Sequence, residues 1–210
     1  MKTVEWYFDF VSPFSYLAME QSHRLPKDTE ITFTPILFAG LLKHWNHKGP
    51  AEIPEKRRFT MRHIQWLASR HGIPLKIPPA HPFNPLAVLR LSLALNNDPE
   101  VIREIFRFIW RDGRRPDESD SWQDLTHNLN VKDADERVTS PDVKDELRRN
   151  GERALQLGVF GVPTFVVDDE LFWGFDALDF VSDYLLDPRL LESDEMRRLS
   201  QLPIGAERQT

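Results

Sequence analysis

The pattern of apolar and polar positions predicts a strand, a helix and a second strand at the start of the chain. Residues 3–10 alternate and are often β-branched or aromatic, which predicts a strand, and apolar residues at helical spacing over 14–25 predict a helix. A second strand is predicted over 31–36, with Pro35 at its end or at a sheet edge. Because a helix joins the two strands, they should form a βαβ unit and lie parallel.

The middle of the chain, residues 39–157, shows helical periodicity and no firm strand pattern. The helices predicted there cover residues 59–67, 86–95, 101–109, 122–129 and 143–157. We therefore expect this segment to be an all-helical insertion.

Strand patterning returns after the insertion. Residues 158–174 predict two short strands around an acidic turn, for which a β-hairpin is the simplest arrangement. Residues 176–186 predict a last amphipathic helix, and beyond Pro188 the chain is charged without a clear core face. The order βαβ, helices, ββα predicts an α/β, thioredoxin-like fold in one structural unit. Its expected parts are a core at 1–38 and 158–190, an insertion at 39–157 and a tail at 191–210.

Composition narrows the classes of partner. The 210 residues include 27 basic and 33 acidic side chains, a net charge of −6, which argues against a nucleic-acid partner and favours a small molecule. No apolar run reaches the roughly 18 residues that a membrane helix needs. Glu5 and Asp9 interrupt the first apolar stretch, so we interpret it as a strand and not as a signal peptide. A cytoplasmic protein without membrane contact is expected.

The chain contains no cysteine, which excludes disulfides, cysteine-ligated zinc, iron–sulfur clusters and a C-x-x-C redox centre. The histidines complete no metal-binding motif, so no metal is expected. Any thiol chemistry must therefore arrive with a cofactor.

Two features predict where such a thiol would bind. Ser12 stands where a helix N-cap belongs, with Pro13 at the first helical position, so a hydroxyl lies beside unpaired backbone N–H groups that suit an anion or thiolate. The simpler interpretation of Ser12 is an ordinary cap. Val162-Pro163 precedes a predicted core strand, and a cis peptide there would leave backbone groups free for a thiol peptide. The sequence leaves the isomer open.

The chain resembles the kappa-class glutathione transferases and the bacterial 2-hydroxychromene-2-carboxylate isomerases, which share a DsbA-like thioredoxin fold. The resemblance rests on segments spread over nearly the whole length: 8–18, 48–50 with 56–59, 161–164 and 173–176. It implies that Ser12 replaces the redox cysteine of DsbA-like enzymes and donates its hydroxyl hydrogen to the sulfur of glutathione. It also implies a homodimer.

The resemblance implies further glutathione contacts. Lys56 matches a lysine near the glycine carboxylate, although it also suits a solvated helix start. His47 stands where the kappa class has an asparagine, and an imidazole N–H can serve as the donor there. Val162, with a cis Pro163, is expected to bind the cysteinyl backbone. Phe175 and Asp176 match the pair that receives the γ-glutamyl end, although an acidic helix cap is an equally simple role for Asp176.

The substrate side is predicted to take a small aromatic acid. Phe14, Phe83, Asn84 and Trp173 are candidates to line its pocket, although Asn84 also suits a helix cap and an aromatic stripe more often belongs to the core.

The preferred hypothesis is a glutathione-dependent isomerase in aromatic catabolism. It would convert 2-hydroxychromene-2-carboxylate, or a related aromatic acid, to trans-o-hydroxybenzylidenepyruvate by reversible thiolate addition. A kappa-like glutathione transferase or peroxidase is the alternative, and a non-catalytic thiol-peptide-binding module is a third possibility.

Overall fold

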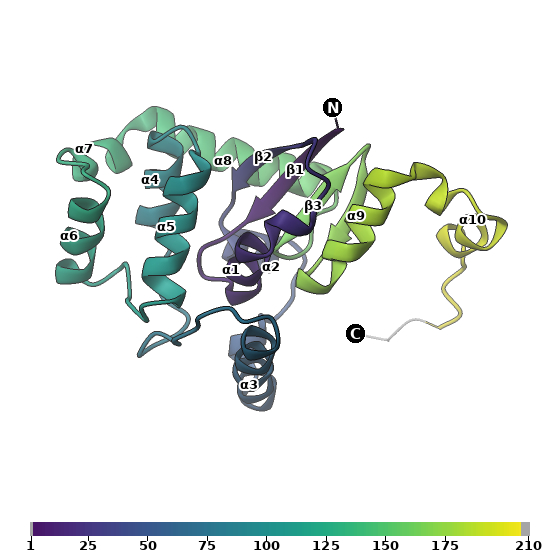
Figure 1. Cartoon of the computed structure of the whole chain (residues 1–210), viewed down its shortest axis with the longest axis horizontal. Coiled ribbons are helices and arrows are strands. Elements are labelled where there is room, and N and C mark those ends of the chain that lie inside the picture. The colour runs from purple at the N-terminus through teal and green to yellow at the C-terminus, as the bar shows by residue number, and fades with distance from the viewer. Residues whose placement is uncertain (1, 207–210) are drawn as a thin grey trace.

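A mixed four-stranded sheet forms the centre of the protein (Figure 1). The computed structural model describes residues 2–206; residue 1 of the predicted core and residues 207–210 of the predicted tail lie outside it. The strand order is β2-β1-β3-β4, and the strands are β1 (Lys2–Phe8), β2 (Thr29–Pro35), β3 (Thr164–Val167) and β4 (Glu170–Trp173). Strand β1 pairs in parallel with β2 and antiparallel with β3.

Strands β3 and β4 form the predicted hairpin. Asp168 and Asp169 turn it, and both have positive φ angles, the backbone state that a tight two-residue hairpin turn requires. Pro35 ends β2 at the edge of the sheet, where its missing N–H removes no hydrogen bond from a neighbouring strand.

Helices account for the rest of the regular structure. The α-helices are α1 (Pro13–Glu20), α2 (Phe38–His44), α3 (Pro54–Arg70), α4 (Leu86–Ala94), α5 (Pro99–Trp110), α6 (Ser119–Asn128), α7 (Ala134–Thr139), α8 (Pro141–Gln156), α9 (Leu178–Leu186) and α10 (Asp194–Ser200). Short 3-10 helices are η1 (Ser22–Arg24), η2 (Pro50–Glu52), η3 (Phe175–Ala177) and η4 (Pro188–Leu191). None of the helices within residues 2–206 has the length and apolarity needed to cross a bilayer.

The sheet buries both of its faces because successive side chains of a strand point to opposite sides. Trp6 and Phe8 belong to a core cluster that includes residues of α1, α5 and α9, whereas Tyr7 belongs to a second cluster with residues of α2 and α8. Figure 1 shows α8 behind the sheet, α4–α7 to one side, α3 below, and α10 standing away from the body. The sheet is thus the middle layer of three.

The predicted strand and helix order is confirmed, with three helices missed. Helices α2, α7 and α10 span no more than seven residues each, too few turns to establish a periodic apolar face. The predicted helix over 14–25 is α1 followed by η1, and the predicted helix over 176–186 is η3 followed by α9. Helix α10 has no buried residue, which explains why its sequence shows no core face.

The aromatic cluster beneath β1 should carry much of the stability. Phe8 is fully buried and its ring lies 5.3–6.4 Å from those of Phe10, Trp6, Phe33 and Phe106. We predict that Phe8→Ala lowers the free energy of unfolding by about 3–5 kcal/mol, measured by urea denaturation. The same change at Phe59, which is 65% exposed, should cost less than about 0.5 kcal/mol. Equal losses would contradict this description of the core.

Candidate active site

Ser12 lies in a buried corner where β1 passes into α1. It is the N-cap of α1, and its Oγ accepts a hydrogen bond from Ser15 N at 3.2 Å while Pro13 occupies the first helical position. The same Oγ donates to the carbonyl oxygen of Val162 at 3.3 Å. The predicted N-cap is therefore present, and the Ser12 hydroxyl contacts the Val162-Pro163 segment that was expected to face it.

Long-range hydrogen bonds hold the turn that leads to Ser12. Ser12 N donates to Asp9 O at 3.0 Å, which closes the turn. The carbonyl of Phe10 accepts from the indole Nε1 of Trp110 at 2.9 Å, and the carbonyl of Val11 lies 2.9 Å from Nε2 of His81. Because Val11 O can only accept, this contact requires the proton on Nε2. Both aromatic anchors come from the helical segment between β2 and β3.

The segment that leads to Pro163 forms the opposite wall. The Val162-Pro163 peptide is cis, which answers the question that the sequence left open. Trp45, which follows α2, donates its indole Nε1 hydrogen to Val159 O at 3.0 Å. Thr164 Oγ1 donates to Gly161 O at 2.8 Å. These contacts fix the wall on both sides of Val162.

Two backbone N–H groups at this corner are free. Within residues 2–206, neither Phe14 N nor Val162 N donates a hydrogen bond, although Val162 is buried. Buried N–H groups are rarely left unpaired, and the first N–H groups of a helix attract anions. The corner thus offers the Ser12 hydroxyl and two N–H donors to an anionic or peptide-like ligand.

Asp9 is a buried carboxylate next to the corner. Its Oδ1 accepts from Val11 N at 2.9 Å and its Oδ2 accepts from Phe38 N, at the start of α2, at 2.8 Å. Burial raises the pKa of Asp9 to about 7, and the two N–H contacts oppose that rise.

The other predicted glutathione contacts lie at different distances from the corner. Element η3, which contains Phe175 and Asp176, packs against α1; Phe175 is buried beside His71, and Asp176 is exposed. Lys56 is exposed in the first turn of α3, and His47 is exposed just beyond α2. The structure thus brings Ser12, Val162 and Pro163 together. It places Phe175 and Asp176 on an element that contacts α1. Within residues 2–206, neither Lys56 nor His47 forms a hydrogen bond to the corner.

The start of α3 nevertheless lies near the Ser12 turn. The positive charge of Arg57 contributes to lowering the pKa of His81, after the larger effect of burial, and His81 contacts Val11. Farther along α3, the ring of His63 lies 6.2 Å from that of Phe14. The approach of the His63 ring to Phe14, together with the contacts between α3 and α1, places α3 beside the start of α1.

The residues predicted to line a substrate pocket divide into two groups. Phe14 is half-buried in the first turn of α1, and Trp173 is 54% exposed with its ring 5.0 Å from that of Phe160. The indole also packs so closely on Gly161 that a Cβ there would collide with it. These residues can face a ligand at the corner.

Phe83 and Asn84 are placed differently. Phe83 is 6% exposed and packs in the main core with Trp110. Asn84 Oδ1 accepts from Leu86 N at 3.1 Å, so its side chain caps the start of α4, although Pro85 and not Asn84 holds the N-cap position. Core packing and capping therefore account for these two side chains, and the structure gives them no contact with Ser12.

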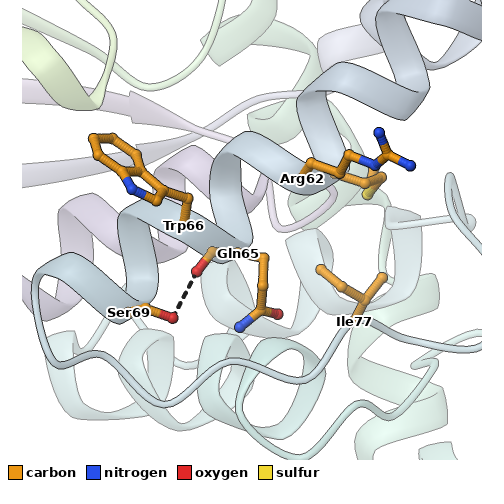
Figure 2. Close-up of a pocket in the computed structure, with 6 residues that line it drawn as sticks. Arg62, Gln65, Trp66, Ser69 and Ile77 are labelled. Carbon is orange, nitrogen blue, oxygen red and sulfur yellow. Dashed lines mark hydrogen bonds between the residues drawn. The ribbon is translucent and has the colours of Figure 1, made fainter.

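Two surface pockets are formed without Ser12. One, of about 490 Å³, is formed by α3 and Ile77; Figure 2 shows Trp66, Gln65 and Arg62 along the helix, with Ser69 bonded to the carbonyl of Gln65. The other, of about 390 Å³, lies between α4, α6 and α7 and includes Asn84. Neither contains Ser12.

Sequence reasoning missed Asp9, His81 and Trp110 as parts of the site. Asp9 did carry a signal, because a lone carboxylate inside an apolar strand needs buried partners. His81 and Trp110 gave none, because their partners are backbone carbonyls of residues far away in the sequence.

Comparisons with known proteins place these features in a family. The model of the DSBA-like thioredoxin domain matches residues 3–186. The chain is 32% identical over 194 residues to a 2-hydroxychromene-2-carboxylate isomerase of Sphingobium xenophagum, covering 89% of this chain and 99% of that protein. It is 29% identical over 209 residues to glutathione S-transferase kappa 2 of Caenorhabditis elegans, covering 89% and 93%.

A solved structure of a 2-hydroxychromene-2-carboxylate isomerase has the same fold. Its TM-score is 0.76 at 23% identity, and the match covers 96% of this chain and 100% of that one. Together with the family match, this likeness confirms the predicted DsbA-like thioredoxin fold.

The anchoring histidine should leave a signature in the pH dependence of stability. Burial lowers the pKa of His81 below its usual 6.5, so the unfolded chain binds more protons as the pH falls below about 6.5 and stability is lost there. We predict that in His81→Gln, which keeps an N–H donor, the free energy of unfolding falls less steeply below pH 6.5 than in the wild type. Urea unfolding at several pH values measures this slope. The control His23→Gln changes an exposed side chain and should keep the wild-type slope. An unchanged slope in His81→Gln would contradict the prediction.

Proposed function

This chain belongs to the DsbA-like thioredoxin domain family, and we propose that it is a glutathione-dependent isomerase. Its proposed reaction converts 2-hydroxychromene-2-carboxylate, or a related small aromatic acid, to trans-o-hydroxybenzylidenepyruvate. One observation carries the proposal: the Ser12 hydroxyl and two free backbone N–H groups meet in a chain without cysteine. Such a corner can hold a thiolate but cannot supply one.

The residues of the corner fit the central part of glutathione. The Ser12–Val162 hydrogen bond is long at 3.3 Å, so the hydroxyl can turn from that carbonyl to a sulfur at little cost. Val162 then offers a free N–H and C=O to the cysteinyl backbone, as one strand does to another. Ser12 and the start of α1 favour the thiolate over the thiol, whose usual pKa is about 8.5.

The ends of the tripeptide require charged partners. In the proposal, Asp176 binds the α-ammonium group of the γ-glutamyl end, and buried Phe175 holds that part of η3 against α1. Lys56 meets the glycine carboxylate from the start of α3, and His47 adds an N–H donor beyond α2.

The chemistry that bound glutathione would supply is a reversible addition to the ring-opened keto form of the substrate: a C–S bond would form at the conjugated C=C bond as the π pair moves to the carbonyl, and elimination after rotation would restore the C=C bond and the free thiolate. Ser12 keeps the sulfur charged and in place throughout. Phe14 and Trp173 provide aromatic surfaces for the substrate on either side of the corner.

A kappa-like glutathione transferase or peroxidase is the second candidate. It is favoured by the 29% identity to a kappa-class transferase over 89% of this chain. The same thiolate corner would serve it, but a transferase would retain the new C–S bond in its product. The homodimer and the cytoplasmic location stay predictions; for the homodimer, light scattering of the purified protein is the direct measurement.

The central prediction concerns Ser12. In a spectrophotometric assay of 2-hydroxychromene-2-carboxylate with glutathione, Ser12→Ala should lower kcat about a hundredfold, because the loss of a hydrogen bond to a charged group leaves less of the bound thiol as the reactive thiolate. The control is Ser193→Ala, which removes an equivalent N-cap serine from α10, where Ser193 Oγ accepts from Met196 N. Ser12→Ala should lose about 1 kcal/mol of stability. Ser193→Ala loses the same kind of cap hydrogen bond and should keep full activity.

Four other outcomes would contradict parts of this proposal. Turnover without glutathione, or full activity of Ser12→Ala, would reject the thiolate mechanism. Conjugation of chlorodinitrobenzene without isomerisation would favour the transferase. Glutathione binding with neither activity would favour a non-catalytic thiol-peptide-binding module.

Lys56 should act on binding alone. We predict that Lys56→Gln raises KM for glutathione roughly fivefold and leaves kcat unchanged, because an exposed charge pair contributes equally to ground and transition states. Lys144→Gln, on the exposed surface of α8, should change neither constant. No change in KM would remove Lys56 from the site, and a fall in kcat would contradict a role in binding alone.

A further inference from the structure

We propose that Asp9 is a positioning residue for the glutathione site, because its carboxylate joins the turn that carries Ser12 to the helix that supports the opposite wall. The inference rests on the proposed function, which does not itself involve Asp9. It adds a residue that touches neither glutathione nor substrate but sets the separation of the groups that do.

The two oxygens of Asp9 bind two different elements. Oδ1 accepts from Val11 N at 2.9 Å in the turn before Ser12, and Oδ2 accepts from Phe38 N at 2.8 Å, the first residue of α2. The N-cap residue of α2, Leu37, has no side-chain hydrogen bond to offer. Asp9 therefore caps α2 from a distance of 29 residues in sequence while it shapes its own turn.

Helix α2 transmits this anchoring to the opposite wall. It ends at His44, and the next residue, Trp45, donates its indole hydrogen to Val159 O at 3.0 Å; Val159 lies three residues before Val162. Val162 O in turn accepts from Ser12 Oγ. Hydrogen bonds thus connect Asp9 to the start of α2, Trp45 after α2 to the 159–162 segment, and that segment to Ser12.

The same helix sets the position of His47. His47 N donates to Leu42 O at 3.0 Å, so the residue is tied to the last turn of α2. A shift of α2 at its Asp9-bound end would move this proposed glutathione contact together with the Val162 wall. Loss of the Asp9 contacts should therefore weaken glutathione binding.

The ionised form of Asp9 is the one that makes both contacts. A carboxylate accepts with both oxygens, whereas a protonated carboxyl turns one oxygen into a donor and leaves one N–H without its acceptor. With the pKa raised to about 7 by burial, both forms are present near neutral pH. Because the ionised form has both contacts, glutathione affinity should rise with pH through this range.

Few other ionisable groups face this carboxylate. Helix α1 has no acidic residue in its first turn, and α2 carries Lys43 and His44 only in its last turn. On the loop side, His81 contacts Val11 O, and on β1 the nearest ionisable side chain in sequence is Tyr7, whose pKa is raised by burial. The causes of the raised pKa of Asp9 include no charged neighbour.

Calorimetry of glutathione binding tests the inference. In the wild-type protein, Kd should be larger below pH 7 than above it. Measured with S-methylglutathione, whose sulfur cannot ionise, Asp9→Asn should raise Kd roughly tenfold above pH 7 and remove most of the pH dependence, because the amide replaces one acceptor by a donor. Asp98→Asn is the matched control: Asp98 also accepts from two backbone N–H groups, at the start of α5, but it is exposed. It should bind glutathione as the wild type does.

Amide NMR of the wild-type protein tests the same inference without a variant. The Val11 and Phe38 N–H resonances should titrate together with one midpoint near pH 7. Independent titration of Val11 and Phe38, or wild-type affinity and pH dependence in Asp9→Asn, would overturn the inference. A wild-type protein that binds no glutathione at any pH would instead reject the proposed function.

Discussion

The site depends on one constraint: the buried turn between β1 and α1 must satisfy its backbone polar groups without blocking Ser12. Partners from three separate parts of the chain meet this requirement, namely the Asp9 carboxylate, the Trp110 indole and the His81 ring. A buried carbonyl or N–H without a partner costs free energy comparable to a lost hydrogen bond. These partners anchor the turn, and within residues 2–206 they leave the Ser12 hydroxyl and the Phe14 N–H available for a ligand.

The helical segment between β2 and β3 has a structural role in this arrangement. It supplies His81 and Trp110 beneath the Ser12 turn, Trp45 beside Val159, and the start of α3 along the corner. A thioredoxin-like core alone would leave the carbonyls of Phe10 and Val11 without these donors. The segment thus completes the site that the βαβ and ββα parts begin.

The fold was largely predictable because its strands and longer helices have clear periods. The β1–α1–β2 unit and the acidic hairpin follow from alternation, helical spacing and turn residues, and the pairing of Ser12 with Val162 follows from their places in that order. The tertiary partners were not predictable. No sequence pattern links Asp9 to Phe38, which lies 29 residues away. An aromatic residue such as Phe83 suits a pocket or the core equally well in sequence, and in the structure it packs against Trp110 in the core.

The central claim is that the Ser12 corner holds glutathione as a thiolate. Ultraviolet absorbance of the thiolate, titrated with pH in the presence of excess protein, measures this ionisation directly. The bound thiol should ionise at a pH clearly below the value of about 8.5 for a free thiol, and Ser12→Ala should return the midpoint toward that value. A midpoint equal to that of free glutathione in the wild-type protein would contradict the account.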